Sequence, residues 1–515
     1  MTHGTGSREW RSPEVAAEGV AVDRGVEEAA SAHPTTSVRG FAKDWFLYGV
    51  VSVLGRVTGV VMLPVYTRYL TPDEYGIRSI VAISINALFL FLALGIPMGV
   101  LRFYRDEDQR ERPEVVSTAL LGVTLLGTAG VVIGWVIAEW LARVMFGGDG
   151  FAQYVRLGIL GLGFGYILEV PLAYLQVTKR SQAFATVAVL RLVVGIALNV
   201  LFVIVLRTGV LGTLYAEILG NAAFCIVLAA LTVARVGSSV SARLFRILIQ
   251  YGAPSLVIAI SSLVIANAGR LMLTRYGSLA DVGLYALADQ IAGVMLLVLV
   301  QPFTTAWGPA QFEMAAKPRE SHMFAELFGL FASVLIVGGF ALSVFAEEIL
   351  RLAAAEAFWP AAAVVPVLVP CYILFGLHAP LNSGILISKR TVYWGAIMTV
   401  AALVNVALSL VLVPDYRVMG AAAGRLGSMM TIIVATYVIA QRIHPIEFAP
   451  GGPLRTFACA AVLFTLSMAI PADVPALSIP LKTALVVALI AAAPPIRLFV
   501  RAHLPGRMQA AFRRG

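Results

Sequence analysis

Charged and amide side chains stand inside long apolar stretches of this sequence, where they could line a binding cavity. Arg56 lies deep in the first stretch, and Asn267, Arg270, Asp289 and Gln290 lie on two consecutive stretches of the second half. An arginine at the centre of a bilayer costs at least about 2.5–3.5 kcal/mol and usually faces a cavity or a partner. These five residues therefore predict a polar, cationic substrate cavity. The alternatives are a buried ion pair for Arg56 and, for Arg270, either a pair with Asp289 or a side chain that reaches the membrane surface.

A second group of ionisable residues suggests two further roles. Glu169 and Arg191 lie at similar distances from the turn at Lys179–Arg180, and hence at similar depth on adjacent helices, which predicts a structural ion pair. Glu169 and His378 each precede a proline by two residues, at equivalent points of the two halves of the chain. Because imidazole changes charge near neutral pH, we also consider Glu169 and His378 for coupling to H+ or Na+. The alternative for His378 is a hydrogen-bonded packing residue.

Catalytic chemistry finds no support in the residue pattern. There is no nucleophile–base arrangement, no metal-ligand spacing and no glycine loop for phosphate. Asp73 and Glu74 belong to a Thr-Pro-Asp-Glu stretch that is typical of a helix N-terminus. The three cysteines, Cys225, Cys371 and Cys459, all fall in apolar stretches and form no CxxC pair. The sequence therefore predicts no catalytic residue, no metal site and no bound cofactor.

The amino-acid composition indicates the class of protein to which these residues belong. The chain has 515 residues, of which 59% are hydrophobic and 13% charged, whereas a soluble domain carries about 25% charged residues. This predicts an all-α integral membrane protein and excludes a secreted disulfide scaffold, a disordered regulator and a cytosolic enzyme. The formal net charge of +9 comes from basic loops between apolar stretches, so we expect no nucleic-acid partner.

The apolar stretches predict about fourteen transmembrane helices, since a helix needs roughly 20 apolar residues to cross the bilayer. They lie near residues 44–67, 78–101, 115–138, 153–175, 184–206, 213–234, 247–272, 283–305, 324–345, 361–387, 391–413, 419–441, 454–471 and 481–499. Lys and Arg are more frequent on the side of the membrane that holds both termini, with Arg68 and Arg78 counted on the opposite, external side. The bias predicts that both termini are cytoplasmic.

The two halves of the chain resemble each other. Four matches occur in order at nearly constant offset: Thr67-Arg68-Tyr69 and Gly76 with Thr274-Arg275-Tyr276 and Gly283 (207), Lys179-Arg180 with Lys389-Arg390 (210), Asn199 with Asn405 (206), and Gly212 with Gly420 (208). An even number of spans separates equivalent points, so the repeats are parallel in the membrane. Parallel repeats are familiar in transporters, which bind substrate between the halves.

The repeat sets the predicted domain boundaries. Residues 1–38 contain no apolar run and predict a disordered cytoplasmic tail. Residues 39–243 and 244–443 predict two six-helix bundles, and residues 444–515 predict two extra helices followed by a cytoplasmic tail.

Two motifs carry a resemblance to a known family. The stretches LPVYTRYLTPDEYGIRS and GVLRFYRDEDQRERPEVVSTAL resemble the polysaccharide-transporter branch, which contains the O-antigen and oligosaccharide flippases, of the multidrug/oligosaccharidyl-lipid/polysaccharide flippase superfamily. The resemblance covers roughly residues 40–500. It implies a flippase of the inner membrane that moves undecaprenyl-diphosphate-linked oligosaccharide to the outer leaflet for polysaccharide export. The implied partners are this lipid-linked oligosaccharide, membrane lipid and the polysaccharide polymerase machinery, and Arg56 would contact the diphosphate or an acidic sugar.

Physical chemistry agrees with a polar, cationic cavity. Each unpaired hydroxyl moved into hydrocarbon costs about 4–8 kcal/mol, which calls for a polar cavity, and the anionic diphosphate favours a cationic one. Three alternatives remain open. A lipid II flippase would share fourteen spans and a cationic cavity, whereas a multidrug and toxin extrusion exporter usually stops at twelve helices and favours acidic coupling sites. A membrane glycosyltransferase or ligase acting on the same lipid would need catalytic groups on a sizeable external loop, and the loops here are short.

Overall fold

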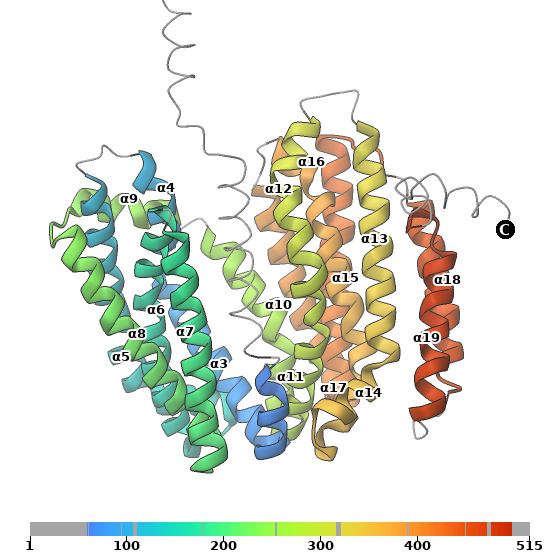
Figure 1. The fold of residues 1–515 in the computed structure, drawn as a ribbon, viewed down its shortest axis with the longest axis horizontal. Helices are drawn as coiled ribbons and strands as arrows, with labels where there is room; N and C mark the ends of the chain where they lie inside the picture. The colour runs from blue at the N-terminus through green and yellow to red at the C-terminus, as the bar shows by residue number, and fades with distance from the viewer. Residues whose placement is uncertain are drawn as a thin grey trace, which may run out of the picture. The chain divides into compact units, whose positions relative to one another are not determined.

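The computed structural model describes residues 59, 61–93, 95–106, 111–178, 180–252, 255–315, 321–388, 390, 392–448, 450–470 and 475–496. These residues form helices and contain no strand (Figure 1). The all-α prediction is therefore confirmed. A helix satisfies its own backbone hydrogen bonds, as an apolar bilayer requires. The predicted tail and Arg56 lie outside the described residues.

The first half consists of residues 61–69, which are helical, and a series of helices joined by short connections. These are α3 (Pro72–Ala93), α4 (Ile96–Asp106), α5 (Arg112–Phe146), the 3-10 turn η1 (Asp149–Phe151), α6 (Ala152–Val177), α7 (Ser181–Asn199), the π-helical η2 (Val200–Val205), α8 (Gly209–Val236) and α9 (Ala242–Gly252).

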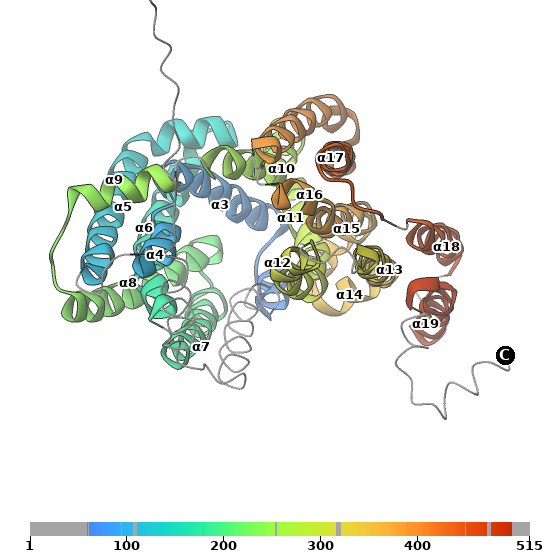
Figure 2. The same ribbon diagram turned by 90° about the horizontal axis from the view of Figure 1, so that it is seen from above.

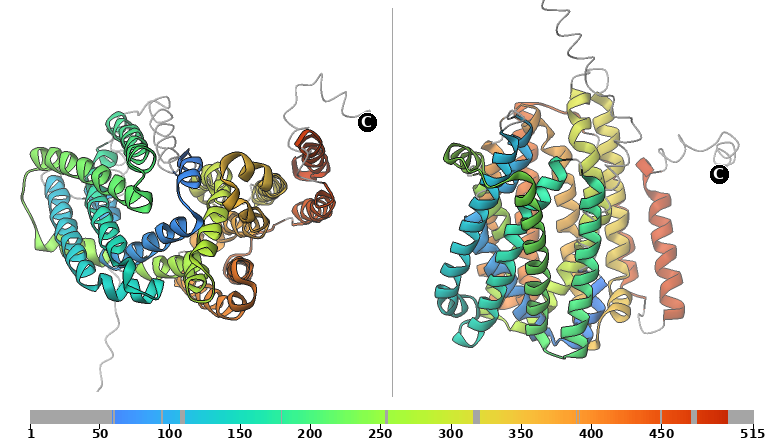
Figure 3. Two further views of the ribbon diagram at one scale, coloured as in Figure 1. Left: turned by 90° about the horizontal axis from the view of Figure 1, so that it is seen from below. Right: turned by 60° about the vertical axis from the view of Figure 1, so that its left-hand side comes forward.

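The second half continues the series to the last described residues. It contains α10 (Ser255–Tyr276), α11 (Leu279–Ala292), the π-helical η3 (Leu296–Val300), α12 (Gln301–Ala315), α13 (Ser321–Val344), α14 (Ala346–Ala353), the 3-10 helix η5 (Glu356–Ala363), α15 (Val365–Leu381), α16 (Ser383–Ile387), α17 (Val392–Ile443), α18 (Gly451–Ser467) and α19 (Pro475–Ala492). Figure 3 shows the long helices of this set running side by side.

Within the described part of the chain, nine helices are long and apolar enough to cross a membrane, and every predicted span after the first coincides with helical residues. Two boundaries differ from the prediction. The span at 78–101 is divided between α3 and α4 at Gly95, which has a left-handed φ of 67°. The span at 247–272 begins as the separate helix α9, which packs against α4 and α5. The two spans at 391–413 and 419–441 are the two arms of α17, which is kinked at Arg417 by a non-helical backbone (φ 46°, ψ −119°), as two separate spans require.

A close contact between the two halves joins α3 and α11 at two equivalent glycines. A Cβ atom on Gly76 would lie 2.0 Å from the carbonyl oxygen of Leu279, and a Cβ atom on Gly283 would lie 2.0 Å from the carbonyl oxygen of Pro72. Pro72 and Leu279 are separated by 207 residues, as are the two glycines. The two helices therefore meet symmetrically, and only glycine permits this approach.

The matched asparagines also make equivalent contacts. Asn199 accepts a hydrogen bond from Tyr66 (2.8 Å), which lies in the helical residues before α3. Asn405 donates to the carbonyl oxygen of Ile265 (3.0 Å) in α10, the helix that occupies the corresponding position in the second half. In each half the asparagine thus fastens its helix to the first helix of the same repeat.

The buried apolar side chains form two large clusters. One gathers residues of α3 to α9, and the other joins residues 62–83 to α10, α11, α15 and α17. The predicted boundary between residues 243 and 244 falls inside α9, which packs on the first cluster.

The last two described helices, α18 and α19, lie beside α13 (Figure 2), and both contact it. Lys482 is 5% exposed and its amine lies 2.5 Å from Glu348, which fastens α19 to α14.

The α3–α11 contact gives a first prediction. Gly76→Ala will place a methyl group into the backbone of α11, and such overpacking costs about 1–3 kcal/mol. We expect a clear fall in the melting temperature of the purified protein, measured by its intrinsic fluorescence in detergent. Gly195→Ala is the matched control, because nothing lies within 4 Å of a Cβ atom at this helical glycine. An equal response of the two variants would contradict the close approach.

Candidate functional site

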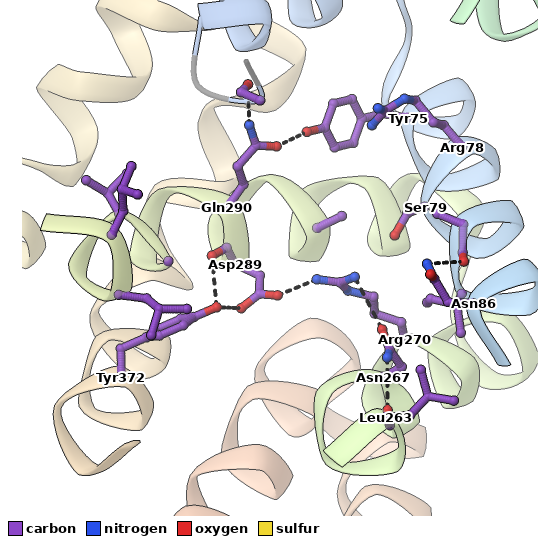
Figure 4. A pocket seen from close by; sticks show the side chains of 18 residues that line it. Tyr75, Arg78, Ser79, Asn86, Leu263, Asn267, Arg270, Asp289, Gln290 and Tyr372 are labelled. Atoms are coloured by element: carbon purple, nitrogen blue, oxygen red, sulfur yellow. Dashed lines mark hydrogen bonds and ion pairs between the residues drawn. The ribbon is translucent and has the colours of Figure 1, made fainter. Parts of the chain in front are cut away.

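Four of the five predicted cavity residues meet at one cavity of about 420 Å³. Asn267 and Arg270 reach it from α10, and Asp289 and Gln290 reach it from α11 (Figure 4). Residues of α3 and Tyr372 of α15 complete the wall. The cavity therefore lies where helices of both halves approach one another. The fifth predicted residue, Arg56, is outside the described part of the chain.

Asp289 is the centre of a buried ionic network. Its two carboxylate oxygens pair with Arg270 of α10 and with Arg425 of α17. The hydroxyl of Tyr372 also donates a hydrogen bond to the carboxylate, at 2.7 Å. The Arg270–Asp289 pair is thus one of the alternatives that the sequence left open, and Arg270 does not extend to the membrane surface.

The network carries more positive than negative charge. Two guanidinium groups share one carboxylate, which leaves a formal excess of one positive charge. The side chain of Arg270 is 17% exposed and that of Arg425 is 10% exposed. Arg270 lines the central cavity, whereas Arg425 does not. Arg270 is therefore the arginine of this network that can reach an anionic ligand in the cavity.

Sequence reasoning missed Arg425, although the signal was present. Arg425 lies inside the predicted span at 419–441, just as Arg56 lies inside the span at 44–67. An ionisable residue at that depth calls for a partner or a cavity. Its partner, Asp289, is 136 residues away in the chain, so the depth alone could not identify it.

Arg78 also belongs to the cavity wall, whereas the charge count placed it on the external side. The helix α3 begins at Pro72, so Arg78 stands within the helix and lines the cavity. Its guanidinium lies over the ring of Tyr66, 4.7 Å from the ring centre. The cavity wall therefore holds a second arginine besides Arg270.

The two predicted amide residues, Asn267 and Gln290, form different hydrogen bonds. Gln290 accepts a hydrogen bond from the hydroxyl of Tyr75 and donates one to the carbonyl oxygen of Gly59, each at 2.5 Å. It thereby joins α11 to the first half of the chain. Asn267 donates to the carbonyl oxygen of Leu263 at 2.9 Å within α10.

Glu169 and His378 line different pockets. Glu169 lies in a pocket of about 500 Å³ that adjoins the central cavity, and His378 lies in one of about 380 Å³ beside Tyr372 and Arg425. The structure therefore does not bring the two residues together. Their role in ion coupling stays a prediction.

The predicted ion pair between Glu169 and Arg191 is not among the ion pairs of the described residues. Arg191 instead contacts the side-chain oxygen of Asn221 on α8, at 3.4 Å. Asn221 also donates to the carbonyl oxygen of Gly161 on α6, at 3.0 Å. Glu169 and Arg191 stand on adjacent helices and lie close enough for their charges to interact, but the described structure shows no direct ion pair between them.

Metal binding has no support within the described ranges. They contain no group of three or more histidine, cysteine, aspartate and glutamate side chains that could hold an ion. Arginines, amides and one carboxylate bound the central cavity instead.

Solved structures with a similar fold are transporters. The lipid II flippase MurJ in an inward closed conformation has a TM-score of 0.71 and 10% identity, covering 90% of this chain and 99% of that one. An inward-facing multidrug resistance MATE family transporter of the MOP superfamily has a TM-score of 0.61 and 17% identity, covering 76% and 95%. An outward-facing one has a TM-score of 0.56 and 15% identity, covering 79% and 97%. No curated protein sequence matches the chain.

A family model supplies the remaining comparison. The model described as "Polysaccharide biosynthesis protein" matches residues 41–315, which is more than half of the 515 residues. This match covers both motifs that suggested the polysaccharide branch, and the fold agrees with it. The resemblance found in the sequence is confirmed, and the chain belongs to the polysaccharide biosynthesis protein family.

Proposed function

We propose that this protein is a flippase that moves undecaprenyl-diphosphate-linked oligosaccharide from the inner to the outer leaflet of the cytoplasmic membrane. The observation that carries the proposal is the excess positive charge of Arg270, Asp289 and Arg425 beside a cavity between the halves. Guanidinium groups bind phosphate through charge-assisted, bidentate hydrogen bonds. A cavity of this charge suits the diphosphate of such a lipid.

The family supports the choice of substrate class. Its members take part in polysaccharide biosynthesis, as its description states, and a similar fold serves a protein that flips lipid II. Lipid-linked saccharides have an anionic headgroup and a long apolar tail, so we propose membrane lipid as a partner. Because the family acts in polysaccharide biosynthesis, we also propose the polysaccharide polymerase machinery as a partner. Arg56 would add a further positive charge to the cavity.

We propose that transport works by alternating access, and the contact between the two halves of the chain supports this mechanism. The α3–α11 contact at Gly76 and Gly283 lies next to the loop after Tyr69, which the charge bias assigns to the external side. With both termini cytoplasmic, this contact would close the cavity to the outside while the cytoplasmic side admits the headgroup. Transport would then require α3 and α11 to separate.

A lipid II flippase is the second candidate, because the MurJ fold matches over 99% of its chain. A cation exporter of the multidrug type is less compatible, since an excess of positive charge repels cationic drugs. Loss of viability on deletion would favour lipid II, whereas loss of a surface polysaccharide alone would favour the proposed function.

The substrate can be tested in a deletion strain. We expect undecaprenyl-linked oligosaccharide to accumulate on the inner leaflet, because no cationic cavity carries it across. Wild type will restore transport, whereas Arg56→Ala and Arg270→Gln will reduce it at least tenfold, measured by extracting the lipid and assigning its leaflet. Arg156→Gln is the control, because Arg156 pairs with Glu139 on another face of the protein. Altered drug sensitivity without accumulation would favour the exporter.

The buried network predicts a specific stability effect. Asp289→Asn leaves two buried arginines without their shared anion, and removing one partner of a buried pair costs about 3–5 kcal/mol. We expect a large fall in melting temperature in detergent. Asp289→Asn combined with Arg425→Gln will recover part of the loss, because the most deeply buried unpaired charge is then gone. If the double variant is no more stable than the single one, the shared-anion arrangement is wrong.

Ion coupling through Glu169 and His378 is a separate proposal. Glu169→Gln and His378→Ala will each weaken the dependence of transport on an imposed H+ or Na+ gradient, because each replaces an ionisable side chain with one that cannot change charge. The measurement is flipping of a lipid-linked saccharide in proteoliposomes with an imposed pH or Na+ gradient. Variants that keep both the wild-type rate and the wild-type dependence on the gradient would remove these residues from coupling.

A further inference from the structure

The central cavity adjoins a neighbouring pocket. We call the cavity lined by Arg78, Arg270 and Asp289 the cationic chamber, and the pocket lined by Glu169 the acceptor chamber. Asn86, Leu263 and Asn267 belong to the walls of both chambers, so a ligand that passes these side chains would occupy both. Their volumes, about 420 and 500 Å³, both lie in the range of small-molecule sites.

The two chambers differ in charge. Glu169 is the only aspartate, glutamate, lysine or arginine among the described residues that line the acceptor chamber. It is exposed and forms no direct ion pair in the described part of the chain, and Arg191 is near enough to interact with its charge. The nearby Arg191 does not line the chamber and instead contacts Asn221. The carboxylate is therefore presented to whatever occupies the chamber.

The hydrogen-bonding groups of the acceptor chamber complement a donor-rich ligand. Asn86 donates to the carbonyl oxygen of Ala82 at 2.7 Å, and the hydroxyl of Ser262 donates to the carbonyl oxygen of Ile258 at 2.8 Å. Each group donates one hydrogen bond inside its own helix and keeps a side-chain oxygen that can accept, while the Asn86 amide retains a second N–H. With the carboxylate of Glu169, the chamber offers acceptors where the cationic chamber offers guanidinium donors.

An apolar wall completes the acceptor chamber. Phe89 and Tyr166 both line it, and their rings contact each other with centres 5.8 Å apart. Sugars present hydroxyl donors at their edges and apolar C–H groups on their faces. A hydroxyl donates readily to a carboxylate, whereas a second carboxylate brought beside Glu169 would meet charge repulsion in a medium of low dielectric constant.

We propose that the acceptor chamber holds the saccharide next to the diphosphate and that Glu169 selects a neutral or amino sugar over a uronic acid. The inference rests on the proposed function, because the diphosphate must occupy the cationic chamber for the adjoining sugar to enter the other. It narrows the class of substrate from any lipid-linked oligosaccharide to those whose first sugars carry no carboxylate.

The test compares three polyprenyl diphosphates that carry no sugar, a neutral hexose or a hexuronic acid. Binding is measured with the full-length protein in nanodiscs. We expect wild type to bind the neutral conjugate at least tenfold more tightly than the uronic acid conjugate. Glu169→Gln will bring the two affinities within about twofold, and Glu169→Lys will reverse the preference. Glu139→Gln, which alters a carboxylate paired with Arg156 outside both chambers, will keep the wild-type ratio.

The lipid without sugar distinguishes a failure of the role proposed for Glu169 from a failure of the proposed flippase function. Its affinity should be the same in wild type and Glu169→Gln, which also shows that the variant is folded, and it should fall in Arg270→Gln. If wild type binds the lipid without sugar but does not distinguish the two conjugates, the role of Glu169 is overturned and the proposed function stands. A ratio unchanged by Glu169→Gln has the same meaning. If wild type binds none of the three lipids, both proposals are overturned.

Discussion

The shared carboxylate of Asp289 is the interaction on which the described site depends. In a low-dielectric interior two arginines cannot lie close together without an anion between them, and burying the anion requires the arginines. Asp289 thereby joins α11 to α10 and α17, and Tyr372 adds α15 through its hydroxyl. Four helices of the second half are held in one arrangement, and the positive charge that remains is presented to the cavity.

The same helix that carries Asp289 also makes the contact with the first half. Gly283 of α11, almost two turns before Asp289, meets α3, and Gln290, directly after Asp289, meets Gly59. Any movement that opens the α3–α11 contact therefore moves the helix that orders the arginines. This mechanical link makes α11 the element through which charge in the cavity and separation of the halves can influence each other.

The sequence predicted those features that depend on composition, spacing and short connections. The helices follow from apolar length, and the cavity residues of α10 and α11 meet because a short turn joins the two helices. Arg425 reaches Asp289 from a helix far away in the chain, and no spacing rule identifies such a partner. Glu169 and Arg191 lie close enough for their charges to interact without a direct ion pair, because the rotation of a helix about its axis, unlike depth, is set by packing. The breaks between α3 and α4 and between α9 and α10 were hidden within continuous apolar runs.

The paired glycines also bear on how the chain arose. Residue 72 meets 283 as residue 279 meets 76, which is the reciprocal pattern of an isologous dimer interface. Two copies of a six-helix chain would associate through this surface before any fusion of their genes. After fusion the surface still has to match itself, so the two positions cannot drift independently even while the cavity-facing residues of each half diverge.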